Sequence, residues 1–386
     1  MTRLFILLSC LFLSTMLSAQ QSYGGRPDLF SSDAPGGMLR VGGSFFIDMP
    51  RFDVEEMLRE DSINQTFDSR SLRYAKKFQV NINRTNAGVC YLTANNTTVW
   101  RIGIRSRGAY SLNVLFSGFR LPEGAKMFLY NADQSMTLGA FTAKNNRDDG
   151  LFPVAPVAGD ELIVEYHEPD TAAFTGLFTI TEVNHDYINV TGGALKSRPS
   201  RPLLTNTCHS DQICRDDLDN EAQAVVLLSI NGNIFCTGSL LNNTSQDAAP
   251  YLLTSCHCLE GSKPYEETAR TVVVFFNYQS PTCNSDIRGV EEMSMASATL
   301  RAADKELDLA LLELDSVPPE DFRPYYLGWN IEPTPSYPFM GIHQPNGGVK
   351  KVTQSNYPLT TIENYNVAGY HFLELYKVQA WNEGTT

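Results

Sequence analysis

The sequence predicts an all-β protein with two β domains. Runs of alternating apolar and polar residues recur along the chain, Gly, Pro, Asp and Asn separate them, and long helical periodicity is scarce. The chain has 386 residues, of which 42% are hydrophobic and only 19% charged. Such a composition is typical of a globular protein, and this length is sufficient for two or three domains.

Residues 1–19 have the features of a secretory signal peptide. An arginine at position 3 precedes the apolar run 4–17, and the small residues Ser18 and Ala19 follow it, so we expect cleavage after Ala19. The alternative is a membrane anchor, but the run is shorter than the roughly 20 apolar residues that span a bilayer. We therefore expect export to the extracellular space, with the periplasm as the alternative, and no membrane attachment once the signal is removed.

Residues 20–73 are predicted to be a leader, because they are rich in Gly, Ser, Pro and Asp. One helical turn is expected at 54–59. From 74 to 190 the sequence shows the alternation that is typical of β-strands. In one such strand, Trp100, Ile102 and Ile104 lie on one side and arginines lie on the other. These strands predict an antiparallel β-sandwich.

Residues 191–207 are predicted to be a linker, since they contain two glycines, two prolines and three basic residues. The second domain, 208–386, is again β-rich and is expected to be a barrel or a sandwich. Its apolar runs are 224–230, 235–241, 251–254, 271–277, 307–314 and 372–378.

The net charge of −13 argues against a nucleic-acid partner, because phosphates require a basic surface. Six of the eight cysteines lie between positions 208 and 283. This clustering favours disulfides formed in an oxidising compartment.

Two short motifs in the second domain suggest its chemistry. The segment Leu252-Leu253-Thr254-Ser255-Cys256-His257-Cys258 precedes Asp308-Leu309-Ala310-Leu311-Leu312-Glu313. A histidine followed later by an aspartate is the chain order of a Ser/His/Asp triad whose serine comes last. With these motifs, residues 208–386 resemble chymotrypsin-like serine proteases, and most closely the lysyl endopeptidases secreted by bacteria. The further matching segments are Cys236–Thr244, Phe276–Gln279 with Cys283, Gly341–Pro345 with Lys350-Lys351, and 378–386.

The resemblance implies a trypsin-like double β-barrel, with the second barrel incomplete. His257 would be the general base and Asp308 would orient it, while the nucleophilic serine, the oxyanion hole and the specificity pocket would lie beyond Thr386. The substrate would be a protein or peptide cleaved after lysine. The chain by itself is expected to be inactive, because the two residues have no nucleophile to activate.

The resemblance also implies the disulfide pairing. Cys236 would pair with Cys258 and Cys214 with Cys283, whereas the partner of Cys208 would lie beyond the chain. Cys256 departs from the family, and a free thiol there could mispair with Cys236.

Three alternatives concern the same residues. His257 and Asp308 could be a buried structural histidine and an ordinary turn aspartate. A metal site of Cys256, His257 and Cys258 is disfavoured, because adjacent strand residues point to opposite faces and no second Cys/His cluster completes four ligands. Cys256 could also be a nucleophile, although sequence neighbours rarely align for attack. We therefore expect no metal and no cofactor.

The first β domain resembles the pro-region of these proteases, and Lys196-Ser197 offers a lysine bond for self-processing. The alternative is a permanent accessory domain. For the whole chain, the alternative function is a non-catalytic extracellular binding protein with a degenerate protease fold.

Overall fold

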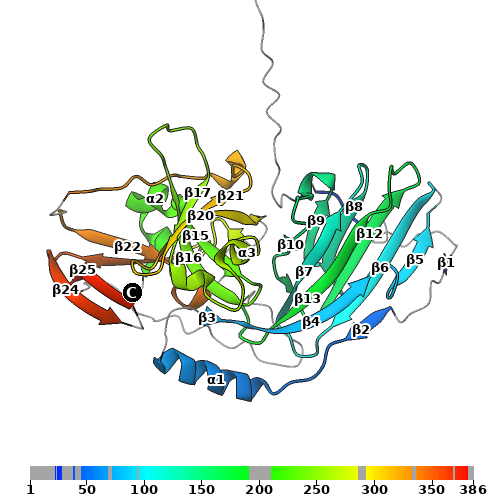
Figure 1. The fold of residues 1–386 in the computed structure, drawn as a ribbon, viewed down its shortest axis with the longest axis horizontal. Helices are drawn as coiled ribbons and strands as arrows, with labels where there is room; N and C mark the ends of the chain where they lie inside the picture. Colours follow the sequence, from blue (N-terminus) through cyan, green and yellow to red (C-terminus); the bar gives the residue numbers. More distant parts are fainter. Residues whose placement is uncertain are drawn as a thin grey trace, which may run out of the picture.

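The computed structural model describes residues 22, 24–27, 38–39, 45–67, 72–93, 95–190, 210–285, 293–332, 336–367 and 370–380. The predicted signal peptide and linker lie outside these residues. The described part is mostly β, so the prediction of an all-β fold is confirmed. Figure 1 shows two β lobes side by side, with the N-terminal lobe in blue to green and the C-terminal lobe in yellow-green to red.

The first lobe is a sandwich of two sheets. One sheet contains, in spatial order, β1 (Met38–Leu39), β5 (Val89–Leu92), β6 (Thr97–Arg105), β12 (Glu161–Pro169), β8 (Lys126–Asn131) and β9 (Thr137–Phe141), with β2 (Phe46–Asp48) parallel to β6. The other contains β10 (Phe152–Pro153), β7 (Ser111–Arg120), β13 (Leu177–Asp186) and β4 (Ala75–Asn83), with β11 (Val157–Ala158) beside β7. Trp100, Ile102 and Ile104 of β6 and Val114 and Phe116 of β7 meet in one buried core, as the alternation predicts.

The second lobe contains the half-barrel of a trypsin-like fold. Its sheet contains β19 (Ser294–Ala296), β18 (Val273–Phe275), β15 (Val225–Ile230), β16 (Ile234–Leu241), β17 (Tyr251–Thr254), β21 (Leu309–Leu314) and β20 (Ala298–Asp304), with β3 (Leu72–Arg73) added to β16. Two smaller units complete this lobe. One is the sheet of β14 (Ser210–Asp211), β23 (Lys351–Ser355) and β22 (Phe339–His343), and the other is the hairpin of β24 (Leu359–Val367) and β25 (Tyr370–Val378).

Helices are short apart from one. The described helices are α1 (Val54–Phe67), α2 (Asp219–Ala224), α3 (Tyr265–Ala269) and the 3₁₀ turns η2 (Ala143–Asn145), η3 (Gln212–Cys214), η4 (Asp216–Leu218), η5 (Cys256–Leu259), η6 (Glu320–Phe322) and η7 (Pro345–Gly347). None of them is long and apolar enough to cross a bilayer.

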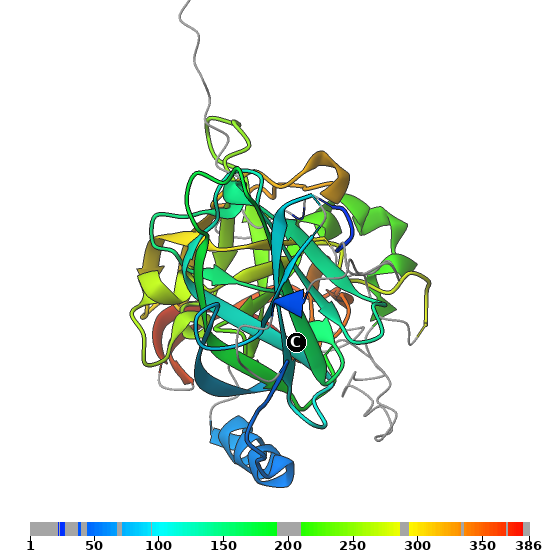
Figure 2. The same ribbon diagram turned by 90° about the vertical axis from the view of Figure 1, so that its right-hand side faces the viewer.

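Helix α1 extends well beyond the single turn expected at 54–59. Asp53 caps its start, since the Asp53 carboxylate accepts the backbone N–H groups of Glu55 (2.9 Å) and Glu56 (3.2 Å). Both glutamates are in the first turn, where negative charge favours the helix dipole. Figure 2 shows α1 standing apart from the sheets at the lower edge of the molecule.

Strands β15 and β18 are buried on both faces. Val226 and Leu228 of β15 point into the core of the half-barrel, whereas Leu227 between them joins the core of the sandwich. In β18, Val274 faces the half-barrel, while Val273 and Phe275 face the sandwich. This arrangement explains why these strands are continuous apolar runs rather than alternating ones.

The turn between β15 and β16 brings the two lobes together. Asn231 and Gly232 both have positive φ, 53° and 68°, as the two central residues of a type I′ turn require, and the Asn233 backbone N–H donates to the Ile230 carbonyl across this turn at 3.2 Å. Asn113 of the sandwich donates from Nδ2 to the Gly232 carbonyl at 3.1 Å. A Cβ atom at Gly232 would lie 2.3 Å from Asn184 Nδ2 and 2.7 Å from Asn113 Oδ1. Glycine is therefore required here for both its conformation and its small size.

We predict that Gly232→Ala destabilises the protein by about 2 kcal/mol or more, because it combines left-handed strain with a steric clash. Chemical denaturation measures the decrease in the free energy of unfolding. The matched control is Gly261→Ala, since nothing lies within 4 Å of a Cβ at that position. Equal stability of the two variants would contradict the proposed packing.

Candidate active site

His257 is positioned by the end of a buried strand. Strand β17 pairs with β16 on one side and with β21 on the other, and its Leu252 is fully buried. The chain leaves β17 at Thr254 and turns into η5, which carries His257. The histidine thus follows directly from a strand held on both sides.

Asp308 lies in the turn that connects β20 and β21. It has a φ of 51°, a left-handed conformation that aspartate tolerates better than most residues. Because β17 and β21 are antiparallel, with Thr254 opposite Ala310, the end of one strand and the start of the other meet at one edge. This topology brings His257 and Asp308 together from distant parts of the sequence.

The Asp308 carboxylate contacts His257 twice. Its Oδ1 accepts the backbone N–H of His257 at 2.9 Å, and its Oδ2 lies 2.7 Å from ring Nδ1. An ionised carboxylate only accepts hydrogen bonds, so a neutral His257 must carry its proton on Nδ1. The lone pair is then on Nε2, where it can take a proton from another group. The side chains are 15% and 19% exposed, so the pair is screened but within reach of solvent.

Two disulfides support this region, with the pairing that the resemblance implies. Cys236–Cys258 joins β16 to η5 beside His257, and Cys214–Cys283 joins η3 to the segment after β18. Cys208 lies outside the described residues. The first bridge ties the chain on the C-terminal side of His257 to the sheet.

Cys256 is a buried free cysteine. Burial raises the pKa of its thiol, with Tyr265 as a hydrogen-bonding neighbour that acts in the opposite direction. A raised pKa disfavours the thiolate needed for nucleophilic attack. Donor atoms of Cys236, His257 and Cys258 lie within 4.8 Å of one another, but both sulfurs are joined in the disulfide and are not thiolate ligands.

The loop after β22 is attached to the half-barrel. The Gln344 backbone N–H donates to Thr237 Oγ1 of β16 at 3.3 Å. Lys351 forms a buried ion pair with Asp211, which links β23 to the first residues of this lobe. The Lys350 ammonium is buried against the Ala222 carbonyl of α2, and burial lowers its pKa to about 7. The sequence motif marked this loop, but it did not indicate that both lysines are buried.

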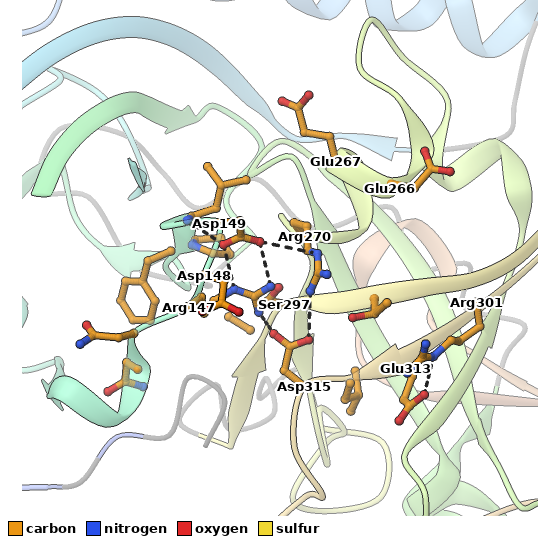
Figure 3. A pocket seen from close by; sticks show the side chains of 18 residues that line it. Arg147, Asp148, Asp149, Glu266, Glu267, Arg270, Ser297, Arg301, Glu313 and Asp315 are labelled. Atoms are coloured by element: carbon orange, nitrogen blue, oxygen red, sulfur yellow. Dashed lines mark hydrogen bonds and ion pairs between the residues drawn. The ribbon is translucent and has the colours of Figure 1, made fainter. Parts of the chain in front are cut away.

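A cavity in the described structure has a lining that does not include the histidine. It has a volume of about 620 Å³ and lies where the sandwich meets the half-barrel (Figure 3). Arg147 and Asp149 from the sandwich face Arg270 and Asp315 from the second lobe. Asp315 contacts both arginines, and Asp149 lies 3.0 Å from Arg147 and 3.6 Å from Arg270. No motif in the sequence predicted this ring of four charges.

Comparison with known proteins shows what the second lobe is similar to. Residues 205–386 match the family described as lysyl endopeptidase, C-terminal domain. A curated lysyl endopeptidase from Pseudomonas aeruginosa is 27% identical over 166 residues, which cover 39% of this chain and 35% of the relative. The match thus spans about a third of the length of that relative.

We predict that Asp308→Asn changes the tautomer of His257. The asparagine amide can direct its oxygen to the backbone N–H of His257 and its NH₂ group to the His257 ring. Nδ1 of the ring then accepts a hydrogen bond, and the ring proton moves to Nε2. Nitrogen-15 NMR of the imidazole distinguishes the two forms at a pH where the ring is neutral. Wild type should show a protonated Nδ1, and an unchanged spectrum in the variant would contradict the assigned contact.

Lys350 should make stability depend on pH. Its pKa is about 7 in the folded protein and close to 10.5 in the unfolded chain. The unfolded state therefore binds more protons between these values, and the contribution of Lys350 to stability rises as pH increases from 7 toward 10.5. Denaturant unfolding from pH 7.5 to 9.5 tests this. The Lys350→Met variant should lack this pH-dependent part of the free energy of unfolding. A difference in unfolding free energy between the two proteins that does not change with pH would refute the assignment.

Proposed function

We propose that this chain, whose residues 205–386 are lysyl endopeptidase-like, belongs to the precursor of a secreted serine endopeptidase that cleaves after lysine. The observation that carries the proposal is the double contact of the Asp308 carboxylate with the backbone and ring of His257. It supports a general-base role, because it fixes both the tautomer and the orientation of the imidazole.

In the proposed reaction, Nε2 of His257 removes the proton of a serine hydroxyl as that oxygen attacks the substrate carbonyl. The imidazolium then gives the proton to the amine as the peptide nitrogen–carbon bond breaks. Asp308 stays ionised and stabilises the imidazolium. We propose that the serine, the oxyanion hole and the lysine pocket are supplied by residues outside these 386, and that this segment alone does not hydrolyse peptides at an enzymatic rate.

The domain assignment is part of the same proposal. Residues 1–19 would direct export, 20–73 would be a leader, 74–190 a pro-domain, 191–207 a processed linker and 208–386 the protease segment. Lys196-Ser197 is the proposed processing bond, because an enzyme specific for lysine could cut it.

The first experiment is to determine the nucleotide sequence beyond the Thr386 codon. A Gly-x-Ser-Gly segment together with a cysteine that can pair with Cys208 would support the enzyme. A stop codon directly after Thr386 would refute the catalytic proposal and favour a non-catalytic binding protein.

If the longer chain is encoded, we predict that His257→Ala and Asp308→Asn each lower kcat on a lysyl peptide by about 10⁴-fold, the size of effect known for triad residues. Steady-state kinetics of the complete enzyme measures this. Cys256→Ser is the matched control and should leave kcat near the wild-type value. A loss of activity in that variant alone would instead identify Cys256 as the nucleophile.

A further inference from the structure

The cavity at the lobe boundary is lined from both lobes (Figure 3). The sandwich contributes residues 145–149 and 151–153, and the second lobe contributes 266–267, 270, 296–297, 299, 301 and 313–315. Its volume of about 620 Å³ lies within the range of roughly 300–1,000 Å³ that small-molecule sites have. Leu151, Pro153 and Leu314 add apolar surface to the lining. The cavity can therefore hold a small ligand or a short piece of peptide.

More carboxylates than cations line this cavity. The cations are Arg147, Arg270 and Arg301, and the acids are Asp148, Asp149, Glu266, Glu267, Glu313 and Asp315. Every arginine already has a carboxylate partner. Arg147 and Arg270 contact Asp149 and Asp315 in the ring of four charges, and Arg301 pairs with Glu313 at 2.5 Å. The excess negative charge therefore belongs to Asp148, Glu266 and Glu267.

Two of these three acids have no cation beside them in the described part of the chain. Glu267 lies 3.5 Å from Lys263, but no basic group of the described residues comes within 4 Å of Asp148 or Glu266. Both residues are exposed at the cavity. Unmatched carboxylates in a recess between two protein walls attract cations and repel anions.

Ser297 is an independent sign of a ligand. It lies between β19 and β20, lines the cavity and is only 2% exposed. Its backbone N–H donates to the Val272 carbonyl at 2.6 Å, which fixes its position. Its Oγ has no hydrogen-bond partner among the described residues. A buried hydroxyl without a partner is costly, and it can accept a hydrogen bond from a donor that enters the cavity.

We propose that this cavity binds a primary ammonium group on an aliphatic stem. An ammonium has three donors and no acceptor, so it complements both the unmatched carboxylates and the free Ser297 oxygen. The apolar residues of the lining accommodate the stem, as they do for lysine side chains in general. Lysine side chains of peptides and free polyamines share this chemistry. The inference goes beyond the proposed function, because such binding requires neither His257 nor a nucleophile.

Binding at this position would hold the lobes together. The ligand contacts residues of the sandwich and of the second lobe, and it can make both sets of contacts only while the lobes are associated. A ligand that binds one state of a protein shifts the equilibrium toward that state. Occupancy of the cavity should therefore oppose separation of the lobes and raise the temperature of unfolding.

Isothermal titration calorimetry of the 386-residue chain tests the proposal. The probe is the blocked peptide acetyl-Lys-Lys-Lys-amide, and its control is the same peptide with every side-chain amine acetylated, which keeps the stem but removes the charge. We expect saturable one-to-one binding of the lysyl peptide at millimolar concentration or below, weaker at high salt, and none of the control. Spermidine in a parallel titration distinguishes a polyamine ligand from a peptide.

Two variants locate the site. Ser297→Ala should weaken binding about tenfold, because it removes a hydrogen bond to a charged group, and Glu266→Gln should weaken it about twofold and reduce its dependence on salt. The matched controls are Ser280→Ala, a buried serine outside the cavity, and Glu123→Gln, an exposed acid outside it. Neither control should change the affinity.

Thermal melting separates binding from stability. Ser297→Ala removes a hydroxyl that has no partner, so its unfolding temperature without ligand should equal or exceed that of wild type. If that variant does not fold, Glu266→Gln still tests the site. Absence of binding by both the lysyl peptide and spermidine would overturn the proposal, as would unchanged affinity in folded Ser297→Ala and Glu266→Gln. Mass spectrometry of the peptide after titration reports any hydrolysis, so failure of the binding site is distinct from failure of the proposed enzyme.

Discussion

Burial of β15 and β18 on both faces is the constraint on which the arrangement of the two lobes depends. Leu227, Val273 and Phe275 face the sandwich, and their neighbours in the same strands fill the half-barrel. Separation of the lobes would return these side chains to water, at a cost of about 25 cal/mol for each Å² of apolar surface exposed. The lobes should therefore stay associated even after the linker cleavage that we propose, unless another partner covers this face.

The same sheet positions the candidate catalytic pair. The core fixes β17 and β21, and their antiparallel register places the end of one beside the start of the other. Asp308 can then contact both the backbone and the ring of His257 without a long, mobile connection. Such preorganisation matters because a general base must be aligned before the proton moves.

The sequence predicted the features that depend on local patterns. Alternation predicted that Trp100 and Ile102 share one side of a strand, and both lie in the core; the motifs around His257 and Asp308 identified the pair that the fold brings together. It did not predict the full length of α1, because that helix has few apolar residues at helical spacing. It also missed β3, since a two-residue strand that pairs some 160 positions away leaves no periodic pattern.

The contacts that join the lobes include an ion-pair cluster and an aromatic stack, and these two respond differently to salt. The ring of Arg147, Asp149, Arg270 and Asp315 is electrostatic and partly exposed, so salt weakens it. The stacking of Tyr74 on Phe235 is buried and apolar, so salt leaves it intact or strengthens it. A change in ionic strength can therefore loosen the cavity side of the boundary while β3 stays on β16.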